Sequence, residues 1–195
     1  MGLKESTSEK TTYVNIKEGK LVVKQVDKTL KEYKSVEGVI RKVVFNYEEF
    51  EGNKFEKAKF YINSVGEILI LQMRTDSGYF RGLCNSLRSS NNIKELLEIQ
   101  PYFSKQDGKP KTTCFVIQNG AALKHFFNKN NVGDFPQLET HEFKGKIMYD
   151  GTKQIEYWKN WLTQTFSETI EEQKPILEQI SEIEQISEAI DDLPF

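Results

Sequence analysis

Alternating apolar and polar residues over the first 120 positions predict a chain that is mainly β. Two short runs flank the sequence Lys-Glu-Gly-Lys at 17–20 and predict an N-terminal β-hairpin. A longer run follows, with Gly38 at a position that suits a bulge or a sharp bend. The next two runs are separated by the turn sequence Asn-Ser-Val-Gly at 63–66. The predicted strands are 13–16, 21–26, 36–47, 54–62 and 67–74.

One helix and a second hairpin are predicted after these strands. Ser77 and the two polar residues before it supply an N-cap, and apolar residues then recur with the period of a helix. These apolar positions are Phe80, Leu83, Cys84 and Leu87. Residues 93–103 and 112–118 predict two further strands, with the turn formers Asp107 and Gly108 between them.

Three strands in a meander, one helix and a two-stranded hairpin is the element order of the OB-fold, a small, partly open, five-stranded barrel that binds oligonucleotides. We therefore predict an OB-fold barrel with one inserted helix over residues 36–127, after an N-terminal extension, 1–35, that carries the extra hairpin. Residues 128–166 are expected to form an irregular connection, with a strand near 147–149, and then a helix packed on the barrel. Residues 167–195 are expected to form an acidic tail that is partly disordered or helical. The apolar stripe of the packed helix is Ile155, Trp158, Leu162 and Phe166.

The strand predicted at 54–62 carries the most informative pattern. Successive side chains point to opposite faces, so Ala58, Phe60 and Ile62 share one face, which suits a core. The other face carries Phe55, Lys57, Lys59 and Tyr61. Rings mixed with ammonium groups suit contact with single-stranded nucleic acid, because bases stack on rings and cations contact phosphates. Partly exposed aromatic residues beside solvated lysines are the alternative explanation.

Other basic and aromatic residues lie close to this strand in the predicted fold. The hairpin loop 104–111 is basic, and a flexible basic loop can hold a nucleic-acid backbone without recognising its sequence. The loop 48–53 is acidic and is not expected to contribute. Arg81 and Arg88 are expected to be solvated charges on the helix, and His125 a structural residue. The further candidates for DNA binding are Arg41, Arg74, Tyr102, Lys105, Lys109 and Lys111.

Charge is unevenly distributed along the chain, which holds 27 basic and 29 acidic residues for a net charge of −2. Residues 163–195 hold one basic and nine acidic residues, a net charge of −8, so residues 1–162 carry +6. A basic body with an acidic end is typical of a polyanion-binding protein with an interaction tail. An ordinary solvated surface that ends in an acidic helix explains the charges equally well.

Composition also excludes several classes of protein. The longest apolar run, 68–71, has four residues, whereas a membrane-spanning helix needs about 18. The polar N-terminus lacks a signal segment, so we expect a cytoplasmic protein. The spacing of Cys84 and Cys114 fits no metal site, and with only two histidines we expect buried free thiols and neither metal nor cofactor. Without a phosphate-binding glycine loop or a nucleophile–base set, an enzyme is not expected.

The last five residues form a compact peptide ligand: Asp191, Asp192, Leu193, Pro194 and Phe195. The Phe195 ring can fill an apolar pocket while its terminal carboxylate meets an arginine or backbone donors. The run 175–190 before it sets aliphatic residues among glutamates, the pattern of an acidic amphipathic helix that folds on a partner.

This ending resembles the single-stranded-DNA-binding proteins of bacteria and their phages, a family that pairs an OB-fold with an acidic tail ending Asp-Asp-x-Pro-Phe. Residues 191–195 match every fixed position of that motif. The resemblance implies a tip that docks replication, recombination and repair enzymes and that competes with DNA for the basic face. The extra hairpin, the Trp-bearing helix and the short tail depart from bacterial members. These departures indicate a phage-encoded relative in the host cytoplasm and leave the oligomeric state open.

Residues and resemblance together predict a protein without enzymatic activity that coats and protects single-stranded DNA during replication and recombination. Its partners would be the DNA, through stacking and charge neutralisation, and other proteins, through the tip. A single-strand annealing protein and an RNA-binding OB module would share the same surface and stay open as alternatives. A pure interaction protein would use the acidic helix and bind no polynucleotide.

Overall fold

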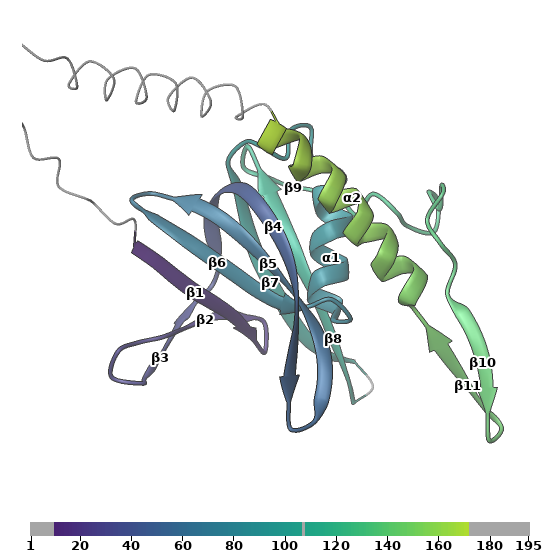
Figure 1. The fold of residues 1–195 in the computed structure, drawn as a ribbon. Coiled ribbons are helices and arrows are strands. Elements are labelled where there is room, and N and C mark those ends of the chain that lie inside the picture. The colour runs from purple at the N-terminus through teal and green to yellow at the C-terminus, as the bar shows by residue number, and fades with distance from the viewer. Residues whose placement is uncertain (1–9, 107, 172–195) are drawn as a thin grey trace, which may run out of the picture.

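The structure, a computed structural model, describes residues 10–106 and 108–171. The strands are β1 (Lys10–Lys17), β2 (Lys20–Lys24), β3 (Leu30–Tyr33), β4 (Val36–Phe50), β5 (Asn53–Ser64), β6 (Glu67–Arg74), β7 (Leu97–Gln106), β8 (Lys109–Gln118), β9 (Ala121–Ala122), β10 (Glu139–Phe143) and β11 (Lys146–Asp150). The helices are α1 (Gly78–Leu87) and α2 (Thr152–Glu171). Nine strands form one mixed sheet in the order β3-β2-β1-β6-β5-β4-β7-β8-β9, and β10 pairs with β11 alone (Figure 1). The prediction of a mainly β chain is confirmed.

The predicted meander of three strands is present as β4, β5 and β6, and its first hairpin is longer than predicted. β4 and β5 stay paired out to Phe50 and Asn53, so the predicted loop 48–53 is reduced to a turn at Glu51 and Gly52. These two residues have φ angles of +51° and +76°, as a two-residue hairpin turn requires. Glu48 and Glu49 therefore lie on β4, and only Glu51 remains in the turn.

β4 is shared between two parts of the sheet. Its start, Val36 to Gly38, pairs with β7, and the rest, from Val39 onward, pairs with β5, with a bulge between Ile40 and Lys42. The bend thus falls three residues after the predicted Gly38 region. Gly38 instead allows β5 to approach closely, because a Cβ atom there would lie 2.5 Å from the carbonyl oxygen of Asn63.

The predicted barrel is wrong, because the described strands form an open sheet in which β6 and β8 do not pair. The predicted N-terminal hairpin is present as β1 and β2, and β1 pairs in parallel with β6, from Lys10 opposite Glu67 to Val14 opposite Leu71. β1 therefore takes the backbone hydrogen bonds at the edge of β6. Helix α1 packs against β8, where Cβ atoms added at Gly78 and Gly82 would lie 2.3 and 2.1 Å from the hydroxyls of Thr112 and Thr113. The edge of β6 that would close a barrel is thus occupied by β1, and α1 packs closely on β8.

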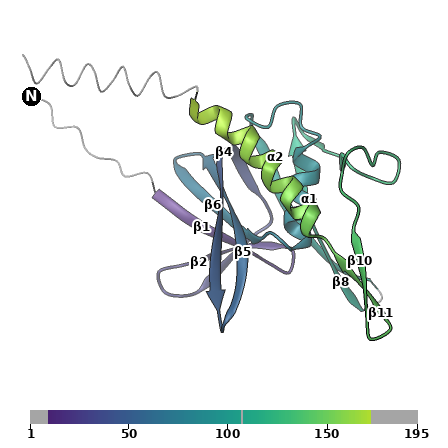
Figure 2. The same ribbon diagram turned by 45° about the vertical axis from the view of Figure 1, so that its right-hand side comes forward.

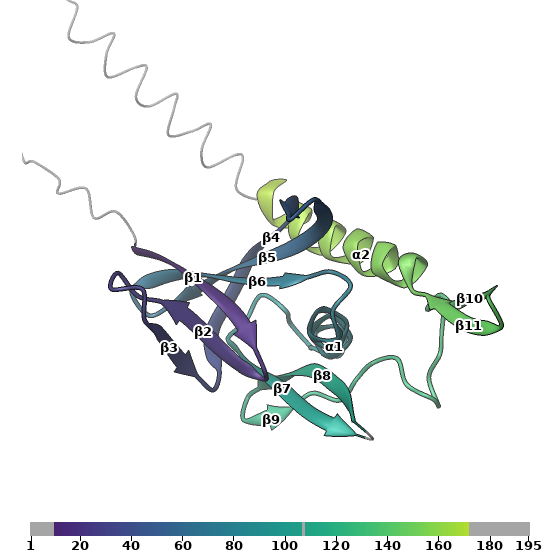
Figure 3. The ribbon, with the colours of Figure 1, turned by 90° about the horizontal axis from the view of Figure 1, so that it is seen from below.

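The core lies between two layers of strands. Seen from below, β4, β5 and β6 form one layer, β7, β8 and β9 form the other, and α1 lies between them (Figure 3). Helix α1 begins as predicted, because the Ser77 hydroxyl accepts a hydrogen bond of 3.2 Å from the Phe80 amide. Its predicted apolar stripe is buried between the layers, with Phe80, Leu83 and Cys84 fully inaccessible.

Helix α2 covers α1 and the end of β4, as its predicted stripe implied (Figure 2). Trp158, Leu162 and Phe166 are buried, whereas Ile155 is only half-buried. The Trp158 ring meets Phe127 and Phe135 at centroid distances of 5.6 and 5.1 Å. This aromatic cluster holds the irregular segment after β9 against the sheet.

The predicted strand near 147–149 is present as β11, in a hairpin that projects away from the sheet (Figure 1). Neither helix of the described residues is long and apolar enough to cross a membrane. Cys84 and Cys114 are free and fully buried, as predicted, and burial raises the pKa of both thiols.

Candidate functional site

The two faces of β5 separate as the alternation predicted. Ala58, Phe60 and Ile62 are at most 1% exposed and form part of the core, so the predicted core stripe is confirmed. The β5 side chains on the opposite face are half-buried. We call this surface the strand face; it consists of Lys42 and Glu48 on β4, Phe55, Lys57, Lys59 and Tyr61 on β5, and Arg74 on β6.

Cations lie over both aromatic rings of the strand face. The Lys57 ammonium and the Arg74 guanidinium lie 5.5 and 5.2 Å from the centroid of the Phe55 ring. The Lys42 ammonium lies 5.8 Å from the centroid of the Tyr61 ring. Pairing explains the arrangement, because Lys57 is directly opposite Arg74, and Lys42 is directly opposite Tyr61. The surface therefore offers both rings and positive charge, and the rings are partly covered by the cations.

An acidic side chain is also part of the strand face. The Glu48 carboxylate lies 2.6 Å from the Lys57 ammonium and 3.5 Å from that of Lys59. The hydrogen bond from Lys57 holds the pKa of Glu48 below its ordinary value, so the carboxylate stays ionised at neutral pH. The expectation that residues 48–53 lie apart from the site is wrong for Glu48, because the longer hairpin places it beside the two lysines.

Arg74 is also paired. Its Nε atom donates a hydrogen bond of 2.9 Å to Asp76, and the guanidinium lowers the pKa of that carboxyl. Arg41 is exposed and falls in the β4 bulge, between the paired residues Ile40 and Lys42. Arg41 therefore has no partner on β5, and its side chain does not belong to the regular pattern of the strand face.

The other predicted DNA-binding residues lie on a different layer. Strands β7 and β8 stay paired as far as Gln106 and Lys109, so the predicted flexible loop 104–111 is wrong. Lys105 and Lys109 are exposed near the end of this hairpin. Tyr102 and Lys111 alternate with the buried residues Ile99 and Cys114, so they lie on the outer side of this hairpin, away from the core. The structure thus divides the predicted site between two surfaces.

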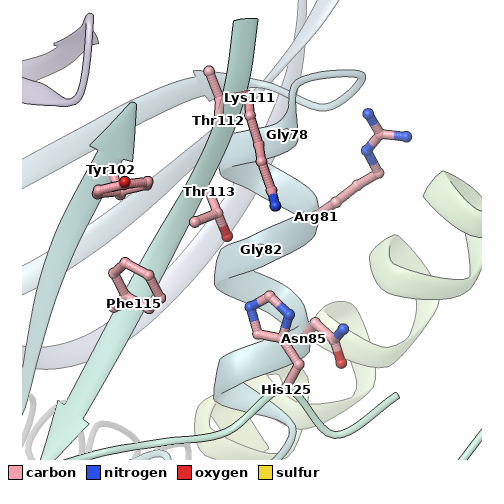
Figure 4. Close-up of a pocket in the computed structure, with 10 residues that line it drawn as sticks. All are labelled: Gly78, Arg81, Gly82, Asn85, Tyr102, Lys111, Thr112, Thr113, Phe115 and His125. Carbon is pink, nitrogen blue, oxygen red and sulfur yellow. The ribbon is translucent and has the colours of Figure 1, made fainter. Parts of the chain in front are cut away.

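Tyr102 and Lys111 border a hollow between α1 and the outer face of β8 (Figure 4). The hollow has a volume of about 480 Å³. The Tyr102 ring lies beside the Phe115 ring, with centroids 5.6 Å apart and planes inclined by 57°. Both rings are exposed, and the Lys111 ammonium points into the middle of the hollow (Figure 4). The lining residues are Gly78, Arg81, Gly82, Asn85, Tyr102, Lys111, Thr112, Thr113, Phe115 and His125.

The electrostatics of the hollow favour an anion. None of the described residues that line it is acidic, whereas Arg81 and Lys111 are cationic. His125 lies at the far end beside Asn85 (Figure 4), and burial lowers its pKa, so its ring is neutral at neutral pH. Asn85 is fixed in place, because its side chain bonds the backbone amide and carbonyl of Phe127 at 2.8 and 2.9 Å.

Sequence reasoning missed Phe115, Arg81 and His125 as members of a site. Only Phe115 left a local signal, since its ring alternates with the buried neighbours Cys114 and Val116. Arg81 is exposed, as expected, but stands at the rim of the hollow. Arg88 differs from its expectation: it is half-buried and lies over the rings of Phe126 and Trp161, at 5.5 and 5.3 Å.

One group of residues in the described part of the chain has ligand atoms spaced for a metal ion. Glu139, His141 and Asp150 bring one ligand atom each within 4.8 Å of one another on the β10–β11 hairpin. Both carboxylates already have partners, since Glu139 pairs with Lys153, and Asp150 accepts hydrogen bonds from the amide and hydroxyl of Thr152. The prediction of a chain without a metal site therefore stays a prediction.

The predicted partner-binding tip, 191–195, and the acidic run before it lie outside the described residues. Comparisons with protein-family models, with curated proteins and with solved structures found no match to this chain.

Proposed function

We propose that this protein binds single-stranded DNA through the strand face. The observation that carries the proposal is the clustering of Phe55 and Tyr61 with the cations Lys42, Lys57 and Arg74 at ring distances of 5.2 to 5.8 Å. Rings of this kind accept unpaired bases by stacking, and cations beside them neutralise the phosphates between those bases. A duplex offers no free base faces, so the same surface discriminates against it.

Binding requires a rearrangement of charge on the strand face. Lys57 and Lys59 are paired with Glu48, and Lys57 lies over the Phe55 ring. A base that stacks on Phe55 displaces Lys57 from the ring, and a phosphate then competes with Glu48 for the ammonium group. Glu48 therefore holds the two lysines in place in the free protein and weakens binding by the cost of this exchange.

We also infer that β4–β8 and α1 form an open variant of the OB-fold. Two observations support this: the order of meander, helix and hairpin, and the pairing of β4 with β7 at its start and with β5 along the rest of its length. The N-terminal strands occupy the edge at which a closed barrel would be completed.

Competition between single-stranded DNA, duplex DNA and RNA of equal length tests the function. We expect single-stranded DNA to bind tightest, and its affinity to fall with salt. With four cations in contact with phosphates, the slope of log K against log salt concentration should be about −3. Preference for RNA, or a slope near zero, would contradict the proposal. Faster pairing of complementary strands in the presence of the protein would favour the annealing alternative.

Replacing Glu48 with glutamine should tighten DNA binding by about 1.4- to fivefold, because partly exposed ion pairs are worth about 0.2–1 kcal/mol. Fluorescence anisotropy with a labelled oligonucleotide at fixed salt measures the change. Glu49→Gln is the matched control, since it removes the same charge from the neighbouring residue, which points to the opposite face of β4. Equal effects of the two variants would show that only net charge matters and would count against the role of Glu48.

A further inference from the structure

We infer that the hollow between α1 and β8 binds one nucleotide, with its base against Tyr102 and Phe115 and its phosphate at Lys111 and Arg81. Where this nucleotide belongs to a DNA strand, the inference rests on the proposed function. A free mononucleotide has the same chemistry and would occupy the same site.

The volume of the hollow and its two exposed rings suit a ligand with a planar base. Its volume of about 480 Å³ falls within the range of small-molecule sites. Tyr102 is 44% exposed and Phe115 37% exposed, so two adjacent rings leave their surfaces to solvent. A base that stacks there buries apolar area that the fold itself leaves uncovered.

The charges of the hollow favour a ligand that carries an anionic group beside its planar base. Lys111 points into the hollow, and Arg81 stands at its rim, on the first turns of α1 (Figure 4). The described lining residues include no carboxylate to compete for these cations, in contrast to the strand face, where Glu48 does so. A cationic ligand is disfavoured, and a phosphate is attracted.

The walls of the hollow are held by close packing. Gly82 lets α1 lie directly against β8, and the paired hydrogen bonds of Asn85 to Phe127 hold the segment that carries His125. The site is therefore largely formed before a ligand arrives, which limits the entropy lost on binding.

Two variants test the inference with little risk to folding, because both side chains are exposed: Phe115→Ala and Lys111→Gln. Matched controls are Phe143→Ala and Lys146→Gln, which remove exposed side chains of the same types from the β10–β11 hairpin. The probes are adenosine and thymidine monophosphates, followed by NMR chemical shifts, and an oligonucleotide carrying iodouracil, followed by photocrosslinking and mass spectrometry.

We expect mononucleotides to shift resonances of residues around the hollow, and the oligonucleotide to crosslink to Tyr102 or Phe115. Phe115→Ala should weaken nucleotide binding by about 5- to 150-fold, and Lys111→Gln should make the salt slope of oligonucleotide binding about 0.7 less steep. The two controls should leave both unchanged.

The outcomes separate this inference from the proposed function. Oligonucleotide binding that is unchanged in Phe115→Ala and Lys111→Gln, without crosslinks at the hollow or mononucleotide shifts there, would overturn the inference and leave the proposed function standing. Mononucleotide binding at the hollow that Phe115→Ala removes, in a protein that binds no oligonucleotide, would support the inference and overturn the proposed function.

Discussion

Replacing both Phe55 and Tyr61 with alanine is expected to weaken the binding of single-stranded DNA by at least about 30-fold. Each stacked base contributes about 1–3 kcal/mol, so the loss of two rings corresponds to about 2–6 kcal/mol. The salt slope should change little, because the cations of the strand face remain. Anisotropy titrations at several salt concentrations give both quantities.

The matched control for this variant is Tyr47→Ala. Tyr47 is 75% exposed on the same hairpin, but it pairs with Glu56 on the face opposite the strand face, so its loss should not affect binding. Since Phe55 and Tyr61 are half-buried, the thermal midpoint of each variant is measured as well. A folded double variant that binds DNA as tightly as the parent would exclude the strand face as the DNA-binding surface.

Replacing Trp158 with alanine is expected to lower the free energy of unfolding by about 3–5 kcal/mol, which is the usual cost of removing a buried aromatic side chain. Trp158 is 1% exposed and contacts the rings of Phe127, Phe135, Tyr157 and Trp161. Its loss leaves a cavity between α2 and the segment after β9, and that segment also carries His125 of the hollow. Urea unfolding followed by far-UV circular dichroism measures the change, because this signal does not depend on tryptophan fluorescence.

A control variant and a conservative variant show how much of that loss comes from the Trp158 ring. Asn160→Ala changes an exposed position two residues along the same helix, so it should be nearly neutral. Trp158→Phe keeps a ring and removes the indole N–H, which has no hydrogen-bond partner among the described residues, so it should cost less than alanine. A loss below about 1 kcal/mol for Trp158→Ala would mean that α2 adds little to the stability of the fold.

Local patterns anticipated those features that depend on neighbouring residues. Alternation along β5 separated Phe60 from Lys59 correctly, the hydroxyl of Ser77 caps α1, and helical spacing identified the buried stripe of α2. Each of these follows from backbone geometry within a few residues. Residue type and position in the predicted hairpin identified Tyr102 and Lys111 as candidates without indicating that they lie on a different surface from Phe55.

Features set by distant segments were not predicted. The edge of β6 is taken by β1, about 57 residues earlier in the chain, and this left the barrel open. Cross-strand register placed Glu48 beside Lys57, and the packing of α1 on β8 brought Arg81 and Lys111 to the same hollow. All the segments that could pack on a strand edge or a helix face compete for it. A local sequence pattern therefore does not predict which segment packs there.

By itself, the sequence determined that this chain is mainly β, which side chains of β5 turn inward, where α1 begins and which stripe of α2 is buried. Only the tertiary structure decided that the sheet stays open, that an acid lies among the cations of the strand face, and that a hollow with two rings and two cations exists behind β8. The physical reason is range: side-chain alternation and capping are properties of a few adjacent residues, whereas edges, registers and hollows are formed by segments that meet only when the chain is folded.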